Sequence, residues 1–161
     1  MKHVMGVLGV AAGLMACSTS SVVSEVYLVR HAEKAVGEDP RLTPEGEVRA
    51  AALSDRLEGV DLVGVHSTDT QRTRDTAAPT AERFGLEVEL YDPRDLESVA
   101  EALRARSGSR LVVGHSNTTP ELAEALGCGP QEPMPETEYD RLIVVRVAEE
   151  GVDCRTERYG G

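Results

Sequence analysis

The sequence lacks the marks of several large protein classes. Its longest apolar run, Val4 to Met15, is too short to span a membrane as a stable helix. Basic residues are outnumbered, 17 Lys and Arg against 28 Asp and Glu, and the net charge of −11 argues against binding to nucleic acid or docking on anionic lipid. No cluster of side chains has metal-ligand spacing, no cofactor is expected, and no internal repeat is present. Any phosphate site must therefore be built by local arginines against the field of the whole chain.

The first residues have the layout of an export signal. A short basic start precedes the apolar run, and Leu14-Met15-Ala16-Cys17 closes it. These four residues resemble a bacterial lipoprotein box, in which the cysteine becomes the lipidated first residue of the mature protein. The resemblance predicts a signal peptide over residues 1–16, a lipidated Cys17 with a tether to Ser24, and a domain over residues 25–161 held at the membrane of the bacterial cell envelope. A plain signal peptide cleaved nearby is the alternative.

Two cysteines, Cys128 and Cys154, remain once Cys17 is set aside. An even number in an exported chain favours a disulfide, because exported proteins mature in an oxidising compartment. Two small buried thiols are the alternative.

Hydrophobic periodicity predicts one domain in which strands and helices alternate. The chain has 161 residues, 40% of them hydrophobic, which is enough for one compact core and short for two. Strands are expected at 26–29, 62–65, 86–90, 110–113, 142–147 and 152–158. Helices are expected at 43–58, at 96–103, in a segment ending near 84 and in one starting at 119. This order favours an α/β fold, a three-layer α/β/α sandwich whose mostly parallel central sheet carries the C-terminal hairpin at its edge.

The starts of the first two helices can be placed from capping residues. Thr43-Pro44-Glu45 has a threonine at the N-cap, a proline in the first helical position and a carboxylate in the first turn. The second helix is expected to be capped by Asp69 or Thr68. An apolar stripe on the first helix is expected from Val48, Ala51, Ala52 and Leu57.

Charged side chains follow three of the expected strands. Arg30 and His31 come directly after the first strand, and His115 follows the strand that ends near Gly114. Arg72 lies in the first turn of the helix after the second strand, where backbone N–H groups and the helix dipole favour an anion. Ligands of open α/β sheets bind outside the carboxyl ends of the strands, so these groups are expected to converge on one crevice.

Three motifs of the chain resemble those of the histidine phosphatase superfamily, the phosphoglycerate-mutase-like fold. They are Leu28-Val29-Arg30-His31-Ala32-Glu33, the run Ser67 to Ala77 around Arg72, and Val113-Gly114-His115-Ser116-Asn117. The opening of the first helix, Leu42 to Gly46, is similar as well. The resemblance implies that His31 is the nucleophile that becomes phosphohistidine. It also implies a set of residues that hold the phosphoryl group, namely Arg30, Arg72 and His115. Asn117 is a further candidate for substrate binding; it and Thr118 follow His115 closely, and they either bond the phosphate or only shape the turn.

The chemistry of phosphoryl transfer agrees with this assignment. A phosphoryl group in transfer spreads negative charge over its oxygens, so catalysis rests on positioning and on pre-placed cations, and no metal is required. His31 must attack as a neutral imidazole whose other nitrogen is held by a hydrogen bond. His115 is expected to help most as an imidazolium, which requires the two pKa values to be pushed apart.

The sequence departs from the family at the general acid. Many relatives carry a glutamate after the second motif to protonate the leaving group, and this chain has no clean match. Asp92 is the preferred candidate, with Asp95 and Glu97 nearby, and the alternative role of Asp92 is a helix cap. Without an acid, good substrates have leaving groups of low pKa, such as phosphoanhydrides, aryl phosphates or phosphohistidine. The chain also lacks the extra length that phosphoglycerate mutases use around their substrate, so hydrolysis is favoured over mutase activity.

The expected function is that of a membrane-anchored, metal-independent phosphatase acting on small phosphomonoesters or phosphoanhydrides, with no nucleic-acid partner. The missing acid suggests an alternative, an envelope lipoprotein that binds a phosphorylated ligand without catalysis. A third possibility is an interaction module with a vestigial pocket. Three residues stay open between a substrate contact and an ordinary strand-end or solvated position: His66, Glu33 and Lys34.

Overall fold

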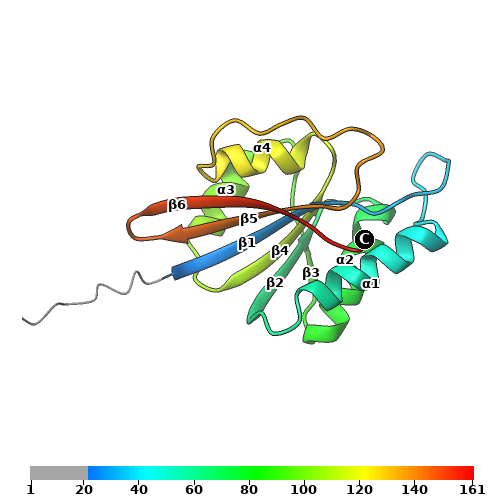
Figure 1. Cartoon of the computed structure of the whole chain (residues 1–161), viewed down its shortest axis with the longest axis horizontal. Helices are drawn as coiled ribbons and strands as arrows, with labels where there is room; N and C mark the ends of the chain where they lie inside the picture. The colour runs from blue at the N-terminus through cyan, green and yellow to red at the C-terminus, as the bar shows by residue number, and fades with distance from the viewer. Residues whose placement is uncertain (1–21) are drawn as a thin grey trace, which may run out of the picture.

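The computed structural model describes residues 22–161, in which strands and helices alternate along the chain (Figure 1). The strands are β1 (Val22–Arg30), β2 (Leu62–Ser67), β3 (Val88–Leu90), β4 (Ser109–Gly114), β5 (Arg141–Ala148) and β6 (Gly151–Arg158). The helices are α1 (Pro44–Arg56), α2 (Gln71–Phe84), α3 (Leu96–Arg104) and α4 (Thr118–Ala125). Each expected element is present, with its ends shifted by a few residues at most.

The strands form one six-stranded sheet in the order β3-β2-β4-β1-β5-β6. The first four run parallel, β5 is antiparallel to β1, and β6 is antiparallel to β5 at the edge. The register pairs Arg30 with Gly114 and Ser67 with Val113, so β1, β4 and β2 end side by side. The predicted α/β fold, with its mostly parallel sheet and edge hairpin, is confirmed.

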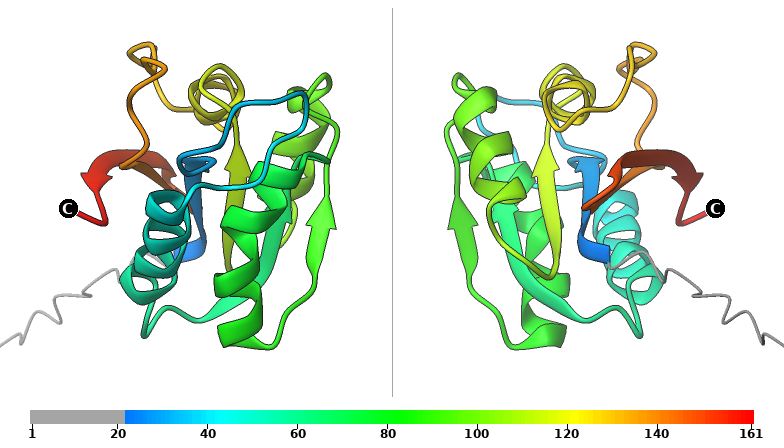
Figure 2. Two further views of the ribbon diagram at one scale, coloured as in Figure 1. Left: turned by 90° about the vertical axis from the view of Figure 1, so that its right-hand side faces the viewer. Right: turned by 90° about the vertical axis from the view of Figure 1, so that its left-hand side faces the viewer.

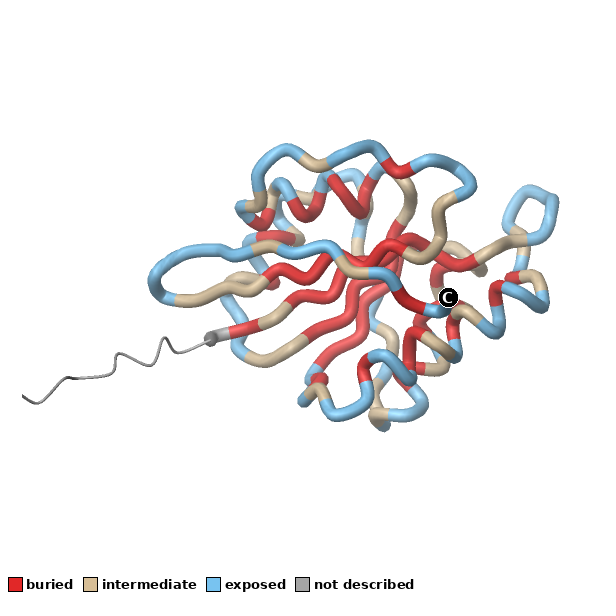
Figure 3. Tube along the Cα trace, viewed as in Figure 1, coloured by how far each residue is buried: buried red, intermediate tan, exposed pale blue. Residues whose placement is uncertain are grey.

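Helices cover both faces of the sheet, which makes three layers (Figure 2). Successive side chains of a strand point to opposite faces, and β1 supplies both cores. Tyr27 and Val29 pack with α1 and α2 residues, whereas Val26 and Leu28 pack with α3 and α4 residues. The central strands are consequently buried, and the exposed surface lies on the loops, the outer helix faces and β6 (Figure 3).

Helix α1 begins at the predicted residues. Thr43 is the N-cap, and its hydroxyl accepts a hydrogen bond of 3.2 Å from the backbone N–H of Gly46. A Cβ on Gly46 would lie 2.1 Å from the carbonyl oxygen of Glu33, so only glycine lets the helix start this close to the chain that leaves β1.

The predicted apolar stripe of α1 was partly wrong. Val48 is 71% exposed and Ala51 is exposed as well. The buried face is formed by Ala50, Leu53 and Leu57. The angle at which the helix meets the sheet is set by tertiary packing, and several residues of this helix are apolar enough to satisfy either stripe.

The predicted cap of α2 was also wrong. The N-cap is Thr70, whose side chain makes no capping bond. The first helical N–H, on Gln71, instead donates to the carboxylate of Asp39 at 2.9 Å. Thr68 is buried beneath the helix start, and Asp69 pairs with Arg74.

The start of β1 moves one predicted boundary. Val22 pairs with Ala148 and Ser24 with Val147, so residues 22–24, expected in the tether, belong to the sheet. The predicted signal peptide, Cys17 and the remainder of the tether lie outside the described residues. No helix between residues 22 and 161 is both long and apolar enough to cross a membrane.

The long loop between α4 and β5, residues 127–140, is named the strap here because it crosses the carboxyl end of β1. Arg141 holds it by donating to the carbonyl oxygens of Glu132 at 2.7 Å and Pro133 at 3.1 Å. The predicted disulfide forms between Cys128, at the start of the strap, and Cys154 in β6, with their Cα atoms 5.9 Å apart.

Candidate active site

The two histidines of the first and third motifs meet at the carboxyl ends of β1 and β4. The backbone N–H of His31 donates to the carbonyl oxygen of Gly114 at 2.9 Å, which locks the end of one strand to the other. The ring centroids of His31 and His115 are 5.7 Å apart, with 69° between the planes. The convergence expected from the strand order is therefore present for this pair.

His31 has the geometry of a nucleophile. Its Nδ1 lies 2.8 Å from the carbonyl oxygen of Ala32. A carbonyl can only accept, so Nδ1 carries the proton and Nε2 keeps a free lone pair. Burial, followed by the positive charges of Arg30 and Arg72, lowers the pKa of His31 to about 4. The imidazole is therefore neutral at pH 7, as nucleophilic attack requires.

His115 is held from two sides. Its backbone N–H donates to the hydroxyl of Thr118 at 2.9 Å, and its Nε2 is hydrogen-bonded to the hydroxyl of Thr68 at 2.9 Å. Burial, with the charges of Arg72 and Arg30, lowers the pKa of His115 to about 4 as well. The expected separation of the two pKa values is absent from this ligand-free site, because both rings are buried beside the same two guanidinium groups.

Arg30 is a buried cation whose guanidinium group has different partners on its two sides. It is 2% exposed and lies 4.4 Å from the ring centroid of Tyr139. Its Nη1 donates to two strap carbonyl oxygens, those of Pro135 at 3.0 Å and Glu138 at 3.2 Å. Its Nη2 donates to the carboxylate of Glu136 at 2.8 Å, and its Nε is buried without a partner. The Nη1 side is thus structural, and the edge formed by Nε and Nη2 is the one that can bind an anion bidentately.

Arg72 is placed by the first turn of α2, as predicted. Its Nη1 lies 3.6 Å from the carboxylate of Asp39, and its Nε is buried without a hydrogen-bond partner among the described residues. Buried donors are normally satisfied. The unpartnered Nε groups of Arg30 and Arg72 mark a place for anionic oxygens between the two arginines.

Asp92 is poorly suited to the role of general acid. It is exposed, and both of its carboxylate oxygens accept hydrogen bonds from the guanidinium of Arg94, at 2.9 and 2.7 Å. These bonds lower the pKa of Asp92 to about 2, so the carboxyl is ionised at neutral pH and has no proton to give. Asp95, one of its neighbours, is the residue that caps α3, through a 3.3 Å bond from the N–H of Ser98.

Asn117 lies apart from the histidine pair. It is the exposed N-cap residue of α4 and makes no capping bond with its side chain. It lines a pocket of about 360 Å³ between α4 and the strap, together with Ser116 and Met134. A role in holding the phosphoryl group itself remains a prediction from the motif.

The three residues left open by the sequence have ordinary contacts in the structure. Glu33 forms an ion pair with Arg49, with its oxygens 2.8 and 2.9 Å from Nε. Lys34 pairs through its backbone with Leu42. His66 lines a separate pocket of about 160 Å³ against α3.

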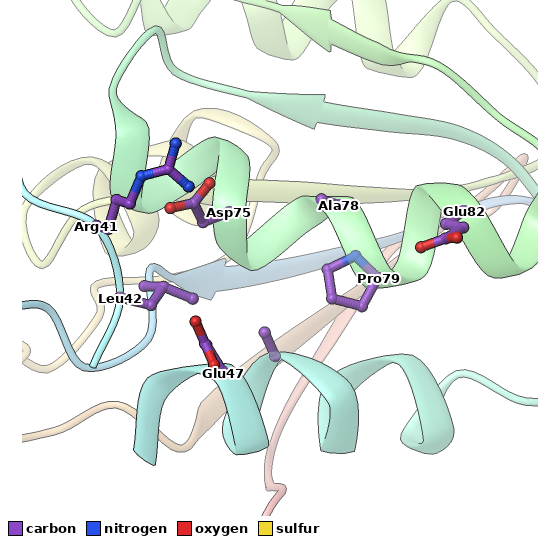
Figure 4. A pocket seen from close by; sticks show the side chains of 8 residues that line it. Arg41, Leu42, Glu47, Asp75, Ala78, Pro79 and Glu82 are labelled. Atoms are coloured by element: carbon purple, nitrogen blue, oxygen red, sulfur yellow. The ribbon is translucent and has the colours of Figure 1, made fainter. Parts of the chain in front are cut away.

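Two further cavities differ in their relation to the histidines. One, of about 480 Å³, opens at His115 and is bounded by the loop that follows β3, including Tyr91, Asp92 and Arg94. It offers space for the rest of a phosphorylated molecule. The other, of about 250 Å³, lies between α1 and α2 and is lined by Leu42, Pro79 and several carboxylates (Figure 4). None of the predicted site residues lines it.

Sequence reasoning missed several residues that shape the site. Thr68 was expected to cap a helix, and it supports His115 instead. Glu136 and Tyr139 contact Arg30 from a strap more than 100 positions later in the chain. No local pattern marks these residues, because a proline-rich loop carries no periodicity. Arg30 itself, a buried cation that needs partners, was the signal that such contacts must exist.

Fold and site together define an α/β protein with an anion site of two imidazoles, the buried guanidinium of Arg30 and the half-buried guanidinium of Arg72, at the carboxyl ends of its parallel strands. Among residues 22–161, no group of three His, Cys, Asp or Glu side chains could hold a metal ion. The chemistry that the residues themselves supply is a neutral nitrogen nucleophile beside cations placed for phosphoryl oxygens.

Comparison with known proteins finds a family match over part of the chain. Residues 26–94, which contain the first two motifs, match the model of the histidine phosphatase superfamily (branch 1). An uncharacterised protein of Mycobacterium tuberculosis is 39% identical over 83 residues, which are 47% of this chain and 41% of that protein. This chain therefore spans less than half the length of that relative.

Solved structures show the same fold. The protein histidine phosphatase SixA complexed with tungstate superposes with a TM-score of 0.67 at 21% identity, over 84% of this chain and 95% of that one. A mycobacterial glucosyl-3-phosphoglycerate phosphatase superposes with a TM-score of 0.66 at 15% identity, over 84% and 97%. YhfR of Bacillus stearothermophilus gives 0.67 at 18% identity, over 83% and 96%. This chain shares that fold, and its first two motifs lie in the segment that matches the histidine phosphatase superfamily model.

Proposed function

We propose that the protein is a metal-independent phosphatase that hydrolyses small phosphomonoesters or phosphoanhydrides through a phosphohistidine on His31. The observation that carries the proposal is the state of this residue. It is neutral, its Nδ1 is held by the carbonyl of Ala32, and it lies in a site whose two arginines each keep an unpartnered Nε.

In the first step, Nε2 of His31 attacks phosphorus and the bond to the leaving oxygen breaks with its electron pair. The charge on the equatorial oxygens is stabilised by the Nε donors of Arg30 and Arg72. His115 is neutral in the empty site, and the arriving negative charge raises its pKa, so it can take up a proton and donate to an oxygen. In the second step, water attacks phosphorus, the bond from phosphorus to Nε2 breaks with its electron pair returning to His31, and the proton lost by water passes to solvent. Inorganic phosphate leaves and His31 is regenerated.

The preferred substrates have leaving groups of low pKa. Asp92 is ionised and paired with Arg94, so it cannot protonate an alkoxide. Phosphoanhydrides, aryl phosphates and phosphohistidine leave without a proton. Two of the similar structures carry names of this kind, SixA and a putative phosphohistidine phosphatase SixA of Nakamurella, and their names fit such a substrate class.

We further propose that the domain works outside the cytoplasm, anchored to the envelope membrane by a lipid on Cys17. The lipoprotein-like box motivates the proposal. The disulfide between Cys128 and Cys154 supports it, because disulfides persist in oxidising compartments.

A binding protein for a phosphorylated ligand is the second candidate function. It is favoured by one observation, the lack of a proton donor at Asp92. A pocket that binds a phosphorylated ligand without hydrolysing it would use the same arginines. Only a measurement of turnover distinguishes the two functions.

The test is hydrolysis of p-nitrophenyl phosphate by the full chain with EDTA present. His31→Ala is expected to lower kcat by about 1,000-fold or more, because it removes the attacking nitrogen. His66→Gln is the matched control, a buried histidine outside the site, and should stay within about two-fold. Equal, negligible rates in wild type and His31→Ala would favour the binding protein, provided that inorganic phosphate still raises the melting temperature.

A further inference from the structure

Both arginines of the phosphoryl site lie next to carboxylates of the protein itself. Each faces a carboxylate from a loop at the rim of the site, and this observation leads to an inference about ligand exchange that rests on the proposed function. Residues 35–41 and the later part of the strap, which leads into β5, lie on the side of the sheet toward which β1 runs (Figure 1).

Glu136 stands on the anion-binding edge of Arg30. One carboxylate oxygen accepts from Nη2 of Arg30 at 2.8 Å and the other accepts from the hydroxyl of Ser116 at 2.9 Å. The neighbouring Nε of Arg30 stays buried without a partner. The carboxylate of Glu136 therefore accepts from only one of the two donors on this edge of Arg30. A phosphoryl group has three oxygens and can accept from both donors.

The side chain of Glu136 is free to leave. It is 78% exposed, whereas Arg30 is 2% exposed. The strap does not depend on this contact, because the carbonyl oxygens of Pro135 and Glu138 bind the other side of Arg30. When the carboxylate of Glu136 is displaced, one exposed ion pair is lost, and the strap is still held by its carbonyl contacts with Arg30.

Asp39 supplies a carboxylate to Arg72, on the Nη1 side of the guanidinium group rather than on the edge formed by Nε and Nη2. Its carboxylate accepts from the backbone N–H of Gln71 at 2.9 Å and lies 3.6 Å from Nη1 of Arg72. The start of α2 was predicted to favour an anion, and in the ligand-free protein that anion is this carboxylate. The Nε of Arg72 is again buried and unpartnered.

We propose that Glu136 is an internal occupant of the phosphoryl site, with Asp39 as a second counter-charge beside Arg72. A substrate's phosphoryl group displaces these carboxylates, and they return when inorganic phosphate departs. They compensate the charge of two arginines that would otherwise bind phosphate product tightly. Their negative charge weakens phosphate binding and speeds the release of the product. They also select for dianionic phosphoryl groups, which outcompete a carboxylate at both arginines at once.

The test measures binding in the full chain and needs no turnover. The variants are Glu136→Gln, Asp39→Asn and the double variant, because each amide keeps the volume and the accepting oxygen while removing the charge. The matched controls are Glu132→Gln in the strap and Glu38→Gln in the other rim loop, two exposed carboxylates that contact neither arginine. Calorimetric titration with inorganic phosphate and with orthovanadate gives the Kd.

The Kd for phosphate is expected to fall about two- to five-fold in each single variant and about ten-fold in the double, with the controls within about 1.5-fold of wild type. Unchanged or weaker binding in Glu136→Gln and Asp39→Asn would overturn the proposal. A second result would also overturn the proposal. If Glu136→Gln lowered kcat only for alkyl phosphates and did not raise the affinity for phosphate, Glu136 would be a proton donor. Because binding is measured without hydrolysis, an inactive wild type would refute the phosphatase and leave this test decisive.

Discussion

At the scale of single residues, the charge state of the site follows from burial. A histidine in water titrates near neutral pH, and desolvation disfavours its charged form. His31 is buried and His115 is half-buried, and both lie beside Arg30 and Arg72, so desolvation and positive charge lower the pKa of both rings. Guanidinium groups are charged throughout the physiological pH range. The result is a site whose cations are permanent and whose nucleophile is neutral.

This arrangement predicts how stability depends on pH. The pKa of His31 and of His115 is about 4 in the folded protein and about 6.5 when the chain is unfolded. Between these values the unfolded chain binds more protons, so the contribution is complete above about pH 6.5 and is lost as the pH falls toward 4. We expect the free energy of unfolding to drop by roughly 1 to 2 kcal/mol per histidine between pH 7 and pH 5.

Urea unfolding at pH 7, 6 and 5 measures this drop, and the variant His31→Gln/His115→Gln should show a flatter profile than wild type. His66, whose pKa is also lowered by burial, remains in both proteins and cancels in the comparison. Carboxylates with lowered pKa values, such as that of Glu33, contribute only below this window. An identical slope in both proteins would contradict the burial argument.

At the scale of elements, the strap shows how an irregular loop is made part of the site. It has no helix or strand of its own, and its carbonyl oxygens are taken by the guanidinium groups of Arg30 and Arg141. The disulfide from Cys128 to Cys154 fixes its start to the edge hairpin. Arg30 is therefore shared between holding this loop and facing the ligand.

Removing the disulfide should destabilise the protein. The variant Cys128→Ser/Cys154→Ser frees a loop of 26 residues in the unfolded chain and is expected to lower the free energy of unfolding by about 3 kcal/mol. Urea unfolding of this variant and of wild type, each with and without reductant, provides the measurement. Reductant should lower the stability of wild type and leave that of the variant unchanged. Equal stability of all four samples would show that the strap is held by its arginine contacts alone.

At the scale of the whole molecule, the site depends on a sheet that is buried on both faces. β1 lies between β4 and β5 and sends alternate side chains into the two cores. The same strand ends in Arg30 and carries the chain into His31. A substitution that disturbs packing along β1 should therefore also disturb the alignment of the two histidines.

Leu28→Ala is expected to lower the free energy of unfolding by about 3 kcal/mol, because Leu28 is buried and the packed neighbours cannot close the cavity fully. Val48→Ala, on the exposed side of α1, is the matched control and should change it by less than about 0.5 kcal/mol. Urea unfolding gives both values. A similar loss in the two variants would mean that the cores do not carry the stability of the fold.

Much of the fold and the identity of the central residues could be predicted from the sequence. Strand and helix order follows from local periodicity, and the threonine and proline that start α1 act through neighbouring backbone groups. His31, Arg30, Arg72 and His115 stand at strand ends or a helix start, and parallel strands end at a common edge. Their placement at one edge of the sheet therefore follows from the pattern, whereas the pairing of β1 with β4, which brings the two histidines to 5.7 Å, is decided by the order of the strands in the sheet.

Only the tertiary structure decided what faces these residues. Glu136 reaches Arg30 across 106 positions of the chain, and Asp39 replaces the predicted cap of α2, because both come from irregular loops whose path no periodicity encodes. The ionised state of Asp92 depends on the geometry of its pair with Arg94, and the exposure of Val48 on the angle at which α1 meets the sheet. Local patterns specify elements and their order, whereas charge compensation and burial depend on groups brought together by packing.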